Sequence, residues 1–206
     1  MTEQILHNKE RLFDLWAPFY DFPLTSVFYQ AVHKRLIEYL ELTQNPQVLD
    51  LGCGTGLLLN RLATTFPQLK GVGLDLSEQM ITEATEGNLY PHRLSYQQGN
   101  AQTMPFHSGQ FTMVFNTISF LHYPHPHQVL QEIYRVLSFG GYYYLADFTV
   151  RDDALFPPIW TSFNQINFYS PQQRQKLATA AGLTCLGHYY LLGPVLLTIF
   201  VKEDRR

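Results

Sequence analysis

The sequence predicts an α/β protein built on a mostly parallel sheet with helices on both faces. Between residues 48 and 148, short apolar runs alternate with stretches whose apolar residues recur at helical spacing, and this alternation is typical of β–α–β units. The first apolar run leads directly into three glycines at alternate positions. Near the end of the chain, apolar runs at 183–191 and 195–201 are joined by a turn around residues 192–194, which permits only antiparallel pairing.

The glycine-rich turn after the first strand is the most informative feature. Residues 47–56 read Gln-Val-Leu-Asp-Leu-Gly-Cys-Gly-Thr-Gly, and an apolar helical run begins at Leu57. Glycines at such a turn let a ligand lie against the backbone, and the N-terminus of the next helix offers N–H groups and partial positive charge. A dinucleotide site needs glycine at position 57, where this chain has leucine. The turn therefore predicts a cofactor other than NAD.

The stretch Asp-Leu-Gly-Cys-Gly-Thr-Gly resembles the first motif of the class I S-adenosylmethionine-dependent methyltransferases. Four later stretches also resemble motifs of this family and follow its order: residues 71–77, 99–106, 111–116 and 130–141. The resemblance implies a Rossmann-like, mostly parallel seven-stranded sheet with an antiparallel C-terminal strand, and S-adenosyl-L-methionine as the cofactor. The alternative is a Rossmann-like protein whose glycine turn binds another ligand or none.

The resemblance also implies which residues hold the cofactor. Asp75 ends the second strand, at the distance from the glycine turn where an acid usually binds ribose hydroxyls. Asn100 stands where the family usually carries aspartate, and its side-chain carbonyl can still accept a hydrogen bond from adenine. Tyr20 resembles a tyrosine that helps hold the methionine end. The residues expected to bind the cofactor are Tyr20, Asp50, Gly52, Cys53, Gly54, Gly56, Asp75, Leu76, Met80, Asn100, Ala101, Gln102 and Asn116.

Candidate catalytic residues follow the fourth strand. His122 matches a histidine common in the family at the mouth of the cofactor site, and either His122 or Tyr123 could remove a proton from a hydroxyl or amine acceptor. His125 and His127 lie close by, but no cysteine or clustered acid joins them, so no metal site is expected. Methyl transfer needs positioning more than a dedicated catalytic dyad.

Aromatic residues outside the predicted strands are candidates for the acceptor pocket. Phe156, Trp160 and Phe163 recur at helical spacing, which predicts a short amphipathic helix. This helix, together with Phe19, is expected to cover the acceptor without contacting adenosine. The alternative is that these aromatics pack in the core.

Bulk properties favour one domain spanning residues 1–206, with 46% hydrophobic and 15% charged residues. We expect an N-terminal helical cap (1–45), a cofactor-binding core (46–148), a cap segment (149–170) and a C-terminal helix with the antiparallel strand pair (171–206). The net charge of −3 and the lack of a basic block argue against nucleic acid as a partner. With two cysteines and no apolar stretch long enough for a membrane span, the expected location is the cytoplasm.

These features together predict a methyltransferase that uses S-adenosyl-L-methionine to methylate a small molecule, with an aromatic or lipophilic acceptor as the leading hypothesis. A protein or RNA methyltransferase is the alternative among enzymes, and the acidic charge disfavours it. A non-catalytic S-adenosylmethionine-binding sensor or partner subunit is the alternative from another class. The sequence does not indicate an oligomeric state or the acceptor atom.

Overall fold

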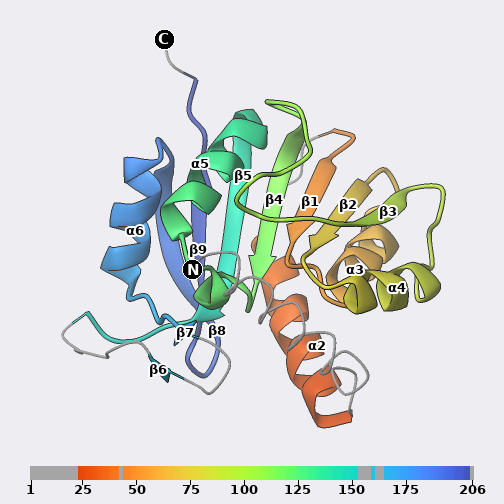
Figure 1. Cartoon of the computed structure of the whole chain (residues 1–206), viewed down its shortest axis with the longest axis horizontal. Helices are drawn as coiled ribbons and strands as arrows, with labels where there is room; N and C mark the ends of the chain where they lie inside the picture. Colours follow the sequence, from red (N-terminus) through yellow and green to blue (C-terminus); the bar gives the residue numbers. More distant parts are fainter. Residues whose placement is uncertain (1–22, 42–43, 153–158, 161–164, 205–206) are drawn as a thin grey trace.

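The computed structural model describes residues 23–41, 44–152, 159–160 and 165–204. Its centre is a seven-stranded sheet with the order β3-β2-β1-β4-β5-β9-β8 (Figure 1). Strand β9 runs in the opposite direction to the other six strands of this sheet. The predicted α/β fold with an antiparallel C-terminal strand is therefore confirmed. The strands are β1 (Gln47–Leu51), β2 (Lys70–Asp75), β3 (Leu94–Gln98), β4 (Phe111–Thr117), β5 (Leu137–Phe148), β8 (Thr184–Leu192) and β9 (Val195–Val201).

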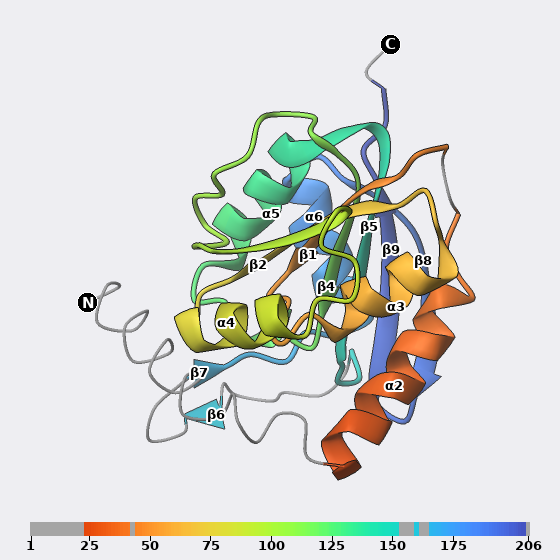
Figure 2. The ribbon, with the colours of Figure 1, turned by 90° about the vertical axis from the view of Figure 1, so that its right-hand side faces the viewer.

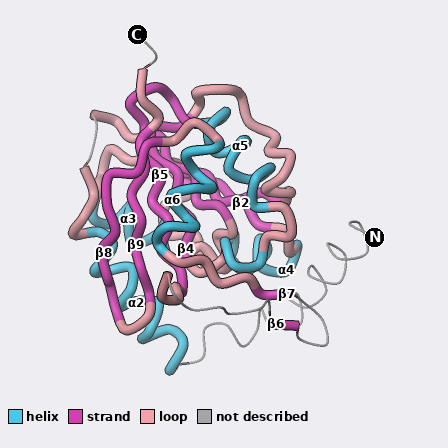
Figure 3. The backbone as a smooth tube through the Cα atoms, turned by 90° about the vertical axis from the view of Figure 1, so that its left-hand side faces the viewer, coloured by secondary structure: helices cyan, strands magenta, loops and turns pink. Residues whose placement is uncertain are grey.

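Helices cover both faces of the sheet, as Figures 2 and 3 show. One hydrophobic core lies between the sheet and helices α2 and α3, and a second lies between the sheet and helices α5 and α6. The strands that separate these cores are apolar on both faces, which explains why they read as continuous apolar runs. The helices are α2 (Pro23–Ile37), α3 (Leu57–Thr65), α4 (Glu78–Glu86), the 3₁₀ turn η1 (Phe120–His122), α5 (Pro126–Val136) and α6 (Pro171–Ala180).

Local sequence signals set the ends of two helices. Ser77 caps α4 by accepting a hydrogen bond from the N–H of Met80. Ser170 begins α6 in a reciprocal capping box with Gln173, and Gly182 follows the helix with a φ of 96°. Such caps satisfy N–H groups that a helix leaves unpaired at its start, so both boundaries could be predicted from sequence.

Residues 130–141 resemble the family's helix, paired-glycine turn and fifth strand, but here the strand begins before the glycines. It begins at Leu137, directly after α5, and Gly140 and Gly141 lie within it. The register with β4 shifts in this region, and Gly140 has a φ of 73°. Gly140 therefore accommodates an irregularity in the strand, because left-handed backbone suits glycine. At Gly141 a Cβ atom would lie 2.8 Å from the carbonyl oxygen of Ser138.

Two predictions about the caps need correction. The i, i+3, i+4 spacing of apolar residues between positions 24 and 40 predicts a helix with an apolar face that includes Val27, but Val27 is 64% exposed in α2. Residues 159–160 form a short strand, β6 (Ile159–Trp160), which pairs with β7 (Gln165–Ile166) and is not helical. Phe19, Tyr20, Phe156 and Phe163 lie outside the described residues, as does the side chain of Trp160.

Candidate active site

The main pocket lies where the strand order reverses between β1 and β4, at the carboxyl ends of the parallel strands. Ligands of open α/β sheets usually bind at this position. Segments after β1, β2, β3 and β4 all contribute to its lining, and its space, including the part open to solvent, is about 730 Å³. The predicted site residues that line it are Gly52, Gly54, Asp75, Leu76, Met80, Asn100, Ala101, Gln102, His122 and Tyr123.

The glycine turn forms one wall of this pocket because side chains would not fit there. Gly52 has a φ of 73°, and a Cβ atom at this position would lie 2.7 Å from Ser119. Gly56 has a φ of 78°, and a Cβ atom there would lie 2.7 Å from the ring of Tyr96. Glycine is therefore required at both positions by backbone conformation and by close packing. Gly56 precedes α3 and does not line the main pocket.

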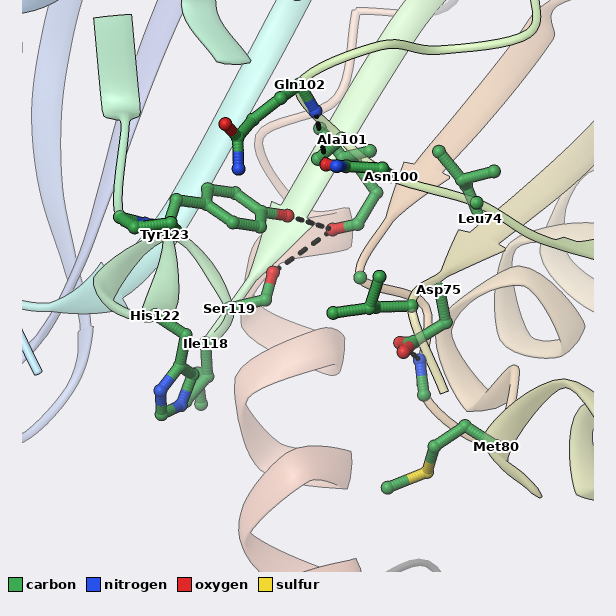
Figure 4. Close-up of a pocket in the computed structure, with 16 residues that line it drawn as sticks. Leu74, Asp75, Met80, Asn100, Ala101, Gln102, Ile118, Ser119, His122 and Tyr123 are labelled. Carbon is green, nitrogen blue, oxygen red and sulfur yellow. Dashed lines mark hydrogen bonds between the residues drawn. The ribbon is translucent and has the colours of Figure 1, made fainter. Parts of the chain in front are cut away.

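Asp75 connects the glycine turn to the end of β2. Its Oδ2 accepts a hydrogen bond from the N–H of Gly54 at 2.9 Å, and its Oδ1 accepts one from the N–H of Ser77 at 3.1 Å. Figure 4 shows the carboxylate at the wall of the pocket, close to Met80. Since each carboxylate oxygen has capacity for more than one donor, Asp75 can hold the turn and still accept from a ligand hydroxyl.

The turn after β3 closes the other side of the pocket (Figure 4). The side-chain carbonyl of Asn100 accepts a hydrogen bond from the N–H of Gln102 at 2.9 Å. This bond stabilises the turn and leaves the second lone pair of the carbonyl for a ligand donor. Ala101 and Leu74 add apolar surface next to it, which suits a planar ring such as adenine.

Asp50 lies outside the pocket lining and is completely buried. Neither of its carboxylate oxygens has a hydrogen-bond partner among the described residues. Burial, reinforced by the nearby Asp75, raises the pKa of Asp50 to about 8. The structure thus places a protonated carboxyl beside the glycine turn at neutral pH, where a new donor or cation would change its charge.

Asn116, which is predicted to contact the cofactor, also lies outside the pocket lining. It is buried in β4, and its amide donates to the carbonyl of Leu51 at 2.6 Å, to the hydroxyl of Ser119 and to the hydroxyl of Tyr123 at 3.2 Å. Its own carbonyl accepts from the hydroxyl of Tyr143 at 3.2 Å. Asn116 therefore supports the residues that form the pocket floor.

The hydrogen-bond network around Asn116 includes Tyr123, which the sequence offered as a candidate base. The hydroxyl of Tyr123 points toward the carbonyl of Leu51 and lies within 3.5 Å of it (Figure 4). Burial raises the pKa of Tyr123 well above that of a free phenol, although hydrogen bonds to Ser119 and Asn116 oppose the shift. A phenol that stays protonated cannot take up a proton, so the geometry favours a positioning role for Tyr123.

His122 lies at the mouth of the pocket, and its ring is directed away from the hydroxyls of Ser119 and Tyr123 (Figure 4). Ile118 and Pro124 line the same side of the pocket. His125 and His127 are exposed at the start of α5. Among the residues that the structure describes, no group of three His, Cys, Asp or Glu side chains could hold a metal ion.

The turn that carries His122 is held from two sides through Leu121. The N–H of Leu121 donates to Oδ2 of the buried Asp147 at 3.0 Å, and its carbonyl accepts from the N–H of Asn167 at 3.0 Å. Burial raises the pKa of Asp147 to about 6, while the charge of Arg174 opposes the shift. Arg174 is itself buried and donates to the carbonyls of Asp147 and Phe148.

A second cavity adjoins the glycine turn, and no sequence pattern indicated it. Cys53, expected at the cofactor site, lines this cavity and not the main pocket. Tyr29 and His33 reach it from α2, and Thr117 from the end of β4. The sequence suggested only that α2 has an apolar face, so polar residues on that helix carried no signal of a site.

The residues present fit the cofactor that the resemblance implies. Gly52 leaves room for a ligand against the backbone, Asp75 offers acceptors for hydroxyls, and Asn100 with Ala101 and Leu74 forms a slot for a ring. Contact between these residues and a cofactor remains a prediction.

None of the helices in the part of the chain that the structure describes has the length and apolar character of a membrane span.

Comparisons with known proteins support the same interpretation. Residues 48–141 match a family model described as a methyltransferase domain. A demethylmenaquinone methyltransferase of Lactiplantibacillus plantarum is 32% identical over 169 residues, which cover 78% of this chain and 70% of that enzyme. A malonyl-[acyl-carrier protein] O-methyltransferase of Marinomonas sp. is 34% identical over 115 residues, which cover 56% of this chain but only 43% of that enzyme.

Solved structures share the fold. A methyltransferase in complex with the Haloferax volcanii Trm112 methyltransferase activator aligns with a TM-score of 0.82 and 22% identity, over 93% of this chain and 98% of that one. Geranyl diphosphate C-methyltransferase from Streptomyces coelicolor, solved with S-adenosyl-L-homocysteine, aligns with a TM-score of 0.73 and 17% identity, over 84% and 79% of the two chains. At these identities the likeness concerns the fold alone.

Proposed function

This chain belongs to the class I S-adenosylmethionine-dependent methyltransferases, and we propose that its acceptor is a lipophilic aromatic small molecule of the hydroquinone type. The apolar acceptor side of the main pocket carries this proposal. Ile118, Tyr123 and Pro124 line that side, with the polar side chains of Ser119 and His122 beside them. A flat apolar ring that carries hydroxyl groups fits such a lining better than a charged or strongly hydrated acceptor.

The 32% identical relative that acts on demethylmenaquinone supports the same class of acceptor. Its name describes a quinone compound, and this chain covers 70% of its length. A protein or RNA acceptor has less support, because the net charge is −3 and no basic block is present in the sequence.

S-adenosylmethionine supplies an electrophilic methyl group, so the protein must position the acceptor and manage one proton. We assign proton removal to His122, since imidazole is the side chain that most often accepts protons in catalysis. Tyr123 and Ser119 would hold the floor beneath the acceptor through their contacts with Leu51 and Asn116. Exclusion of water and alignment would supply most of the acceleration.

The test is transfer of label from S-[methyl-³H]adenosylmethionine. We expect label in a short-chain 1,4-naphthohydroquinone and not in protein or RNA fractions. His122→Asn should lower turnover by about 10²–10⁴-fold with unchanged cofactor affinity, and His92→Asn, at an exposed position remote from the pocket lining, is the matched control. Label confined to protein or RNA would refute the acceptor class. Cofactor binding without turnover on any acceptor would favour a sensor or partner subunit.

We further propose that the protein works in the cytoplasm. Cys53 and Cys185 are both free, and their presence as thiols suits a reducing compartment. Fractionation of cells that express the tagged chain tests this location, and recovery from an oxidising compartment would contradict it.

A further inference from the structure

The second cavity lies beside the glycine turn and shares Gly52 and Gly54 with the main pocket. Its other walls come from Cys53 and Thr55 in the turn and from Tyr29 and His33 on α2. The two cavities therefore meet at the glycines. A ligand in the main pocket that lies against Gly52 and Gly54 is therefore at the boundary of the second cavity.

His33 is the polar side chain in this cavity with an unused hydrogen-bonding atom. It is only 3% exposed, and its Nδ1 lies 2.6 Å from Nη1 of Arg61. A guanidinium group can only donate, so Nδ1 accepts and the proton of the neutral imidazole sits on Nε2. This Nε2 is buried and has no hydrogen-bond partner among the residues that the structure describes.

The charges around Nε2 of His33 determine which kind of ligand group it can bind. Burial, with the charge of Arg61, lowers the pKa of His33 to about 3, so the ring is a neutral donor at physiological pH. Arg61 places a positive charge directly behind it. Helix α3 begins at Leu57, next to the cavity, and its N-terminus adds partial positive charge. All three features favour an anion over a cation.

We propose that His33 binds the carboxylate of the methionine portion of the cofactor through its Nε2–H, with Arg61 as the residue that positions and polarises the ring. This inference rests on the cofactor of the proposed function and assigns one end of it to α2. An orphaned buried donor costs stability unless a ligand satisfies it. A carboxylate forms the stronger, charge-assisted type of hydrogen bond with such a donor.

The experiment compares two ligands that differ only at the carboxylate, S-adenosylhomocysteine and its decarboxylated form, in competition binding so that weak affinities are measured. In the His33→Phe variant we expect the affinity for S-adenosylhomocysteine to fall about tenfold, and the affinity for the decarboxylated ligand to stay within about twofold. His33→Gln keeps a donor near the position of Nε2 and should restore part of the loss. His92→Phe, at an exposed position outside both cavities, is the matched control.

The paired ligands separate a contact from a structural effect. An equal loss for both ligands in His33→Phe, or no loss for either, would overturn the proposal. A wild-type protein that binds neither ligand would instead refute the cofactor assignment itself. Partial unfolding of the variant lowers both affinities equally and so cannot imitate the expected difference.

Discussion

Replacing the buried carboxyl of Asp50 with an amide should change how stability depends on pH. Asp50 has no hydrogen-bond partner among the described residues, and its pKa in the folded protein is about 8, raised by burial and then by Asp75. In the unfolded chain the pKa returns to 3.8, the ordinary value of an aspartate side chain. The folded state therefore binds a proton that the unfolded state has released throughout the interval between these two values.

The sign and size of the effect follow from this difference. Below about pH 4 both states are protonated, and Asp50 does not oppose folding. As the pH rises from about 4 to about 8, the free energy of unfolding falls, and each pH unit costs about 1.4 kcal/mol. Between about pH 5 and pH 9 the loss from this one group is on the order of 4 kcal/mol. Asp50→Asn cannot ionise and should not show this loss.

Urea unfolding of the wild type and Asp50→Asn near pH 5, 7 and 9 measures the difference. The variant should gain stability relative to the wild type as the pH rises, whatever the constant cost of burying the amide. Asp204→Asn, which changes an exposed carboxylate, is the control and should follow the wild type. If the stability of Asp50→Asn also runs parallel to that of the wild type over this range, then the carboxyl of Asp50 is not held protonated in the folded protein.

Four further substitutions have expected outcomes. Asp75→Ala should weaken S-adenosylhomocysteine binding by about 1.5–3 kcal/mol in calorimetry, and unchanged affinity would place the ribose elsewhere. The same substitution should lower the melting temperature, because two backbone N–H groups lose their acceptor. Gly56→Ala should cost about 1–3 kcal/mol in urea unfolding, because its Cβ would meet the ring of Tyr96. Gly193→Ala, with open space around it, should cost less, and equal costs would contradict the packing argument. Arg174→Met should cost about 3–5 kcal/mol, since the buried guanidinium serves several backbone carbonyls, and a loss below about 1 kcal/mol would show that they find other donors.

The sheet and the main pocket could be predicted because their signals are local in the sequence. A strand buried on both faces must be apolar throughout, and a turn that approaches a ligand closely must lack side chains. Asp75 follows such a strand, and Asn100 lies in a turn at the same edge of the sheet. Each of these residues could be predicted to line the pocket from its position relative to a recognisable element.

Other features depend on partners that are distant in sequence. His33 lies on a helix whose apolar face was evident, but its hydrogen bond to Arg61 spans 28 positions. Asn116 looks like a polar residue at the end of a strand, yet its partners include Leu51 and Tyr143. Periodicity does not show which side chains meet across the fold, so the second cavity and the network below the pocket appear only in the structure.

The same limit explains the misassigned cap segment. The spacing of aromatics near Trp160 fits a helix, but residues 159–160 pair with residues 165–166 in a hairpin. Short segments have weak intrinsic preferences, and pairing with another strand overrides them. Val27 shows the corresponding effect in α2, where the apolar stripe predicted from spacing is wider than the surface that the sheet covers.

The attachment of the cap segment at Leu121 has a consequence for how this enzyme can diversify. The bond from the N–H of Asn167 to the carbonyl of Leu121 joins main-chain atoms, so it does not depend on which side chains the segment carries. Side chains in the predicted cap segment can therefore change while this attachment is retained. The glycine turn and Asp75, which we predict to hold the methyl donor, follow other strands and are under separate constraint. This separation predicts that new acceptor specificities can arise in this fold without any change to the residues expected to bind the cofactor.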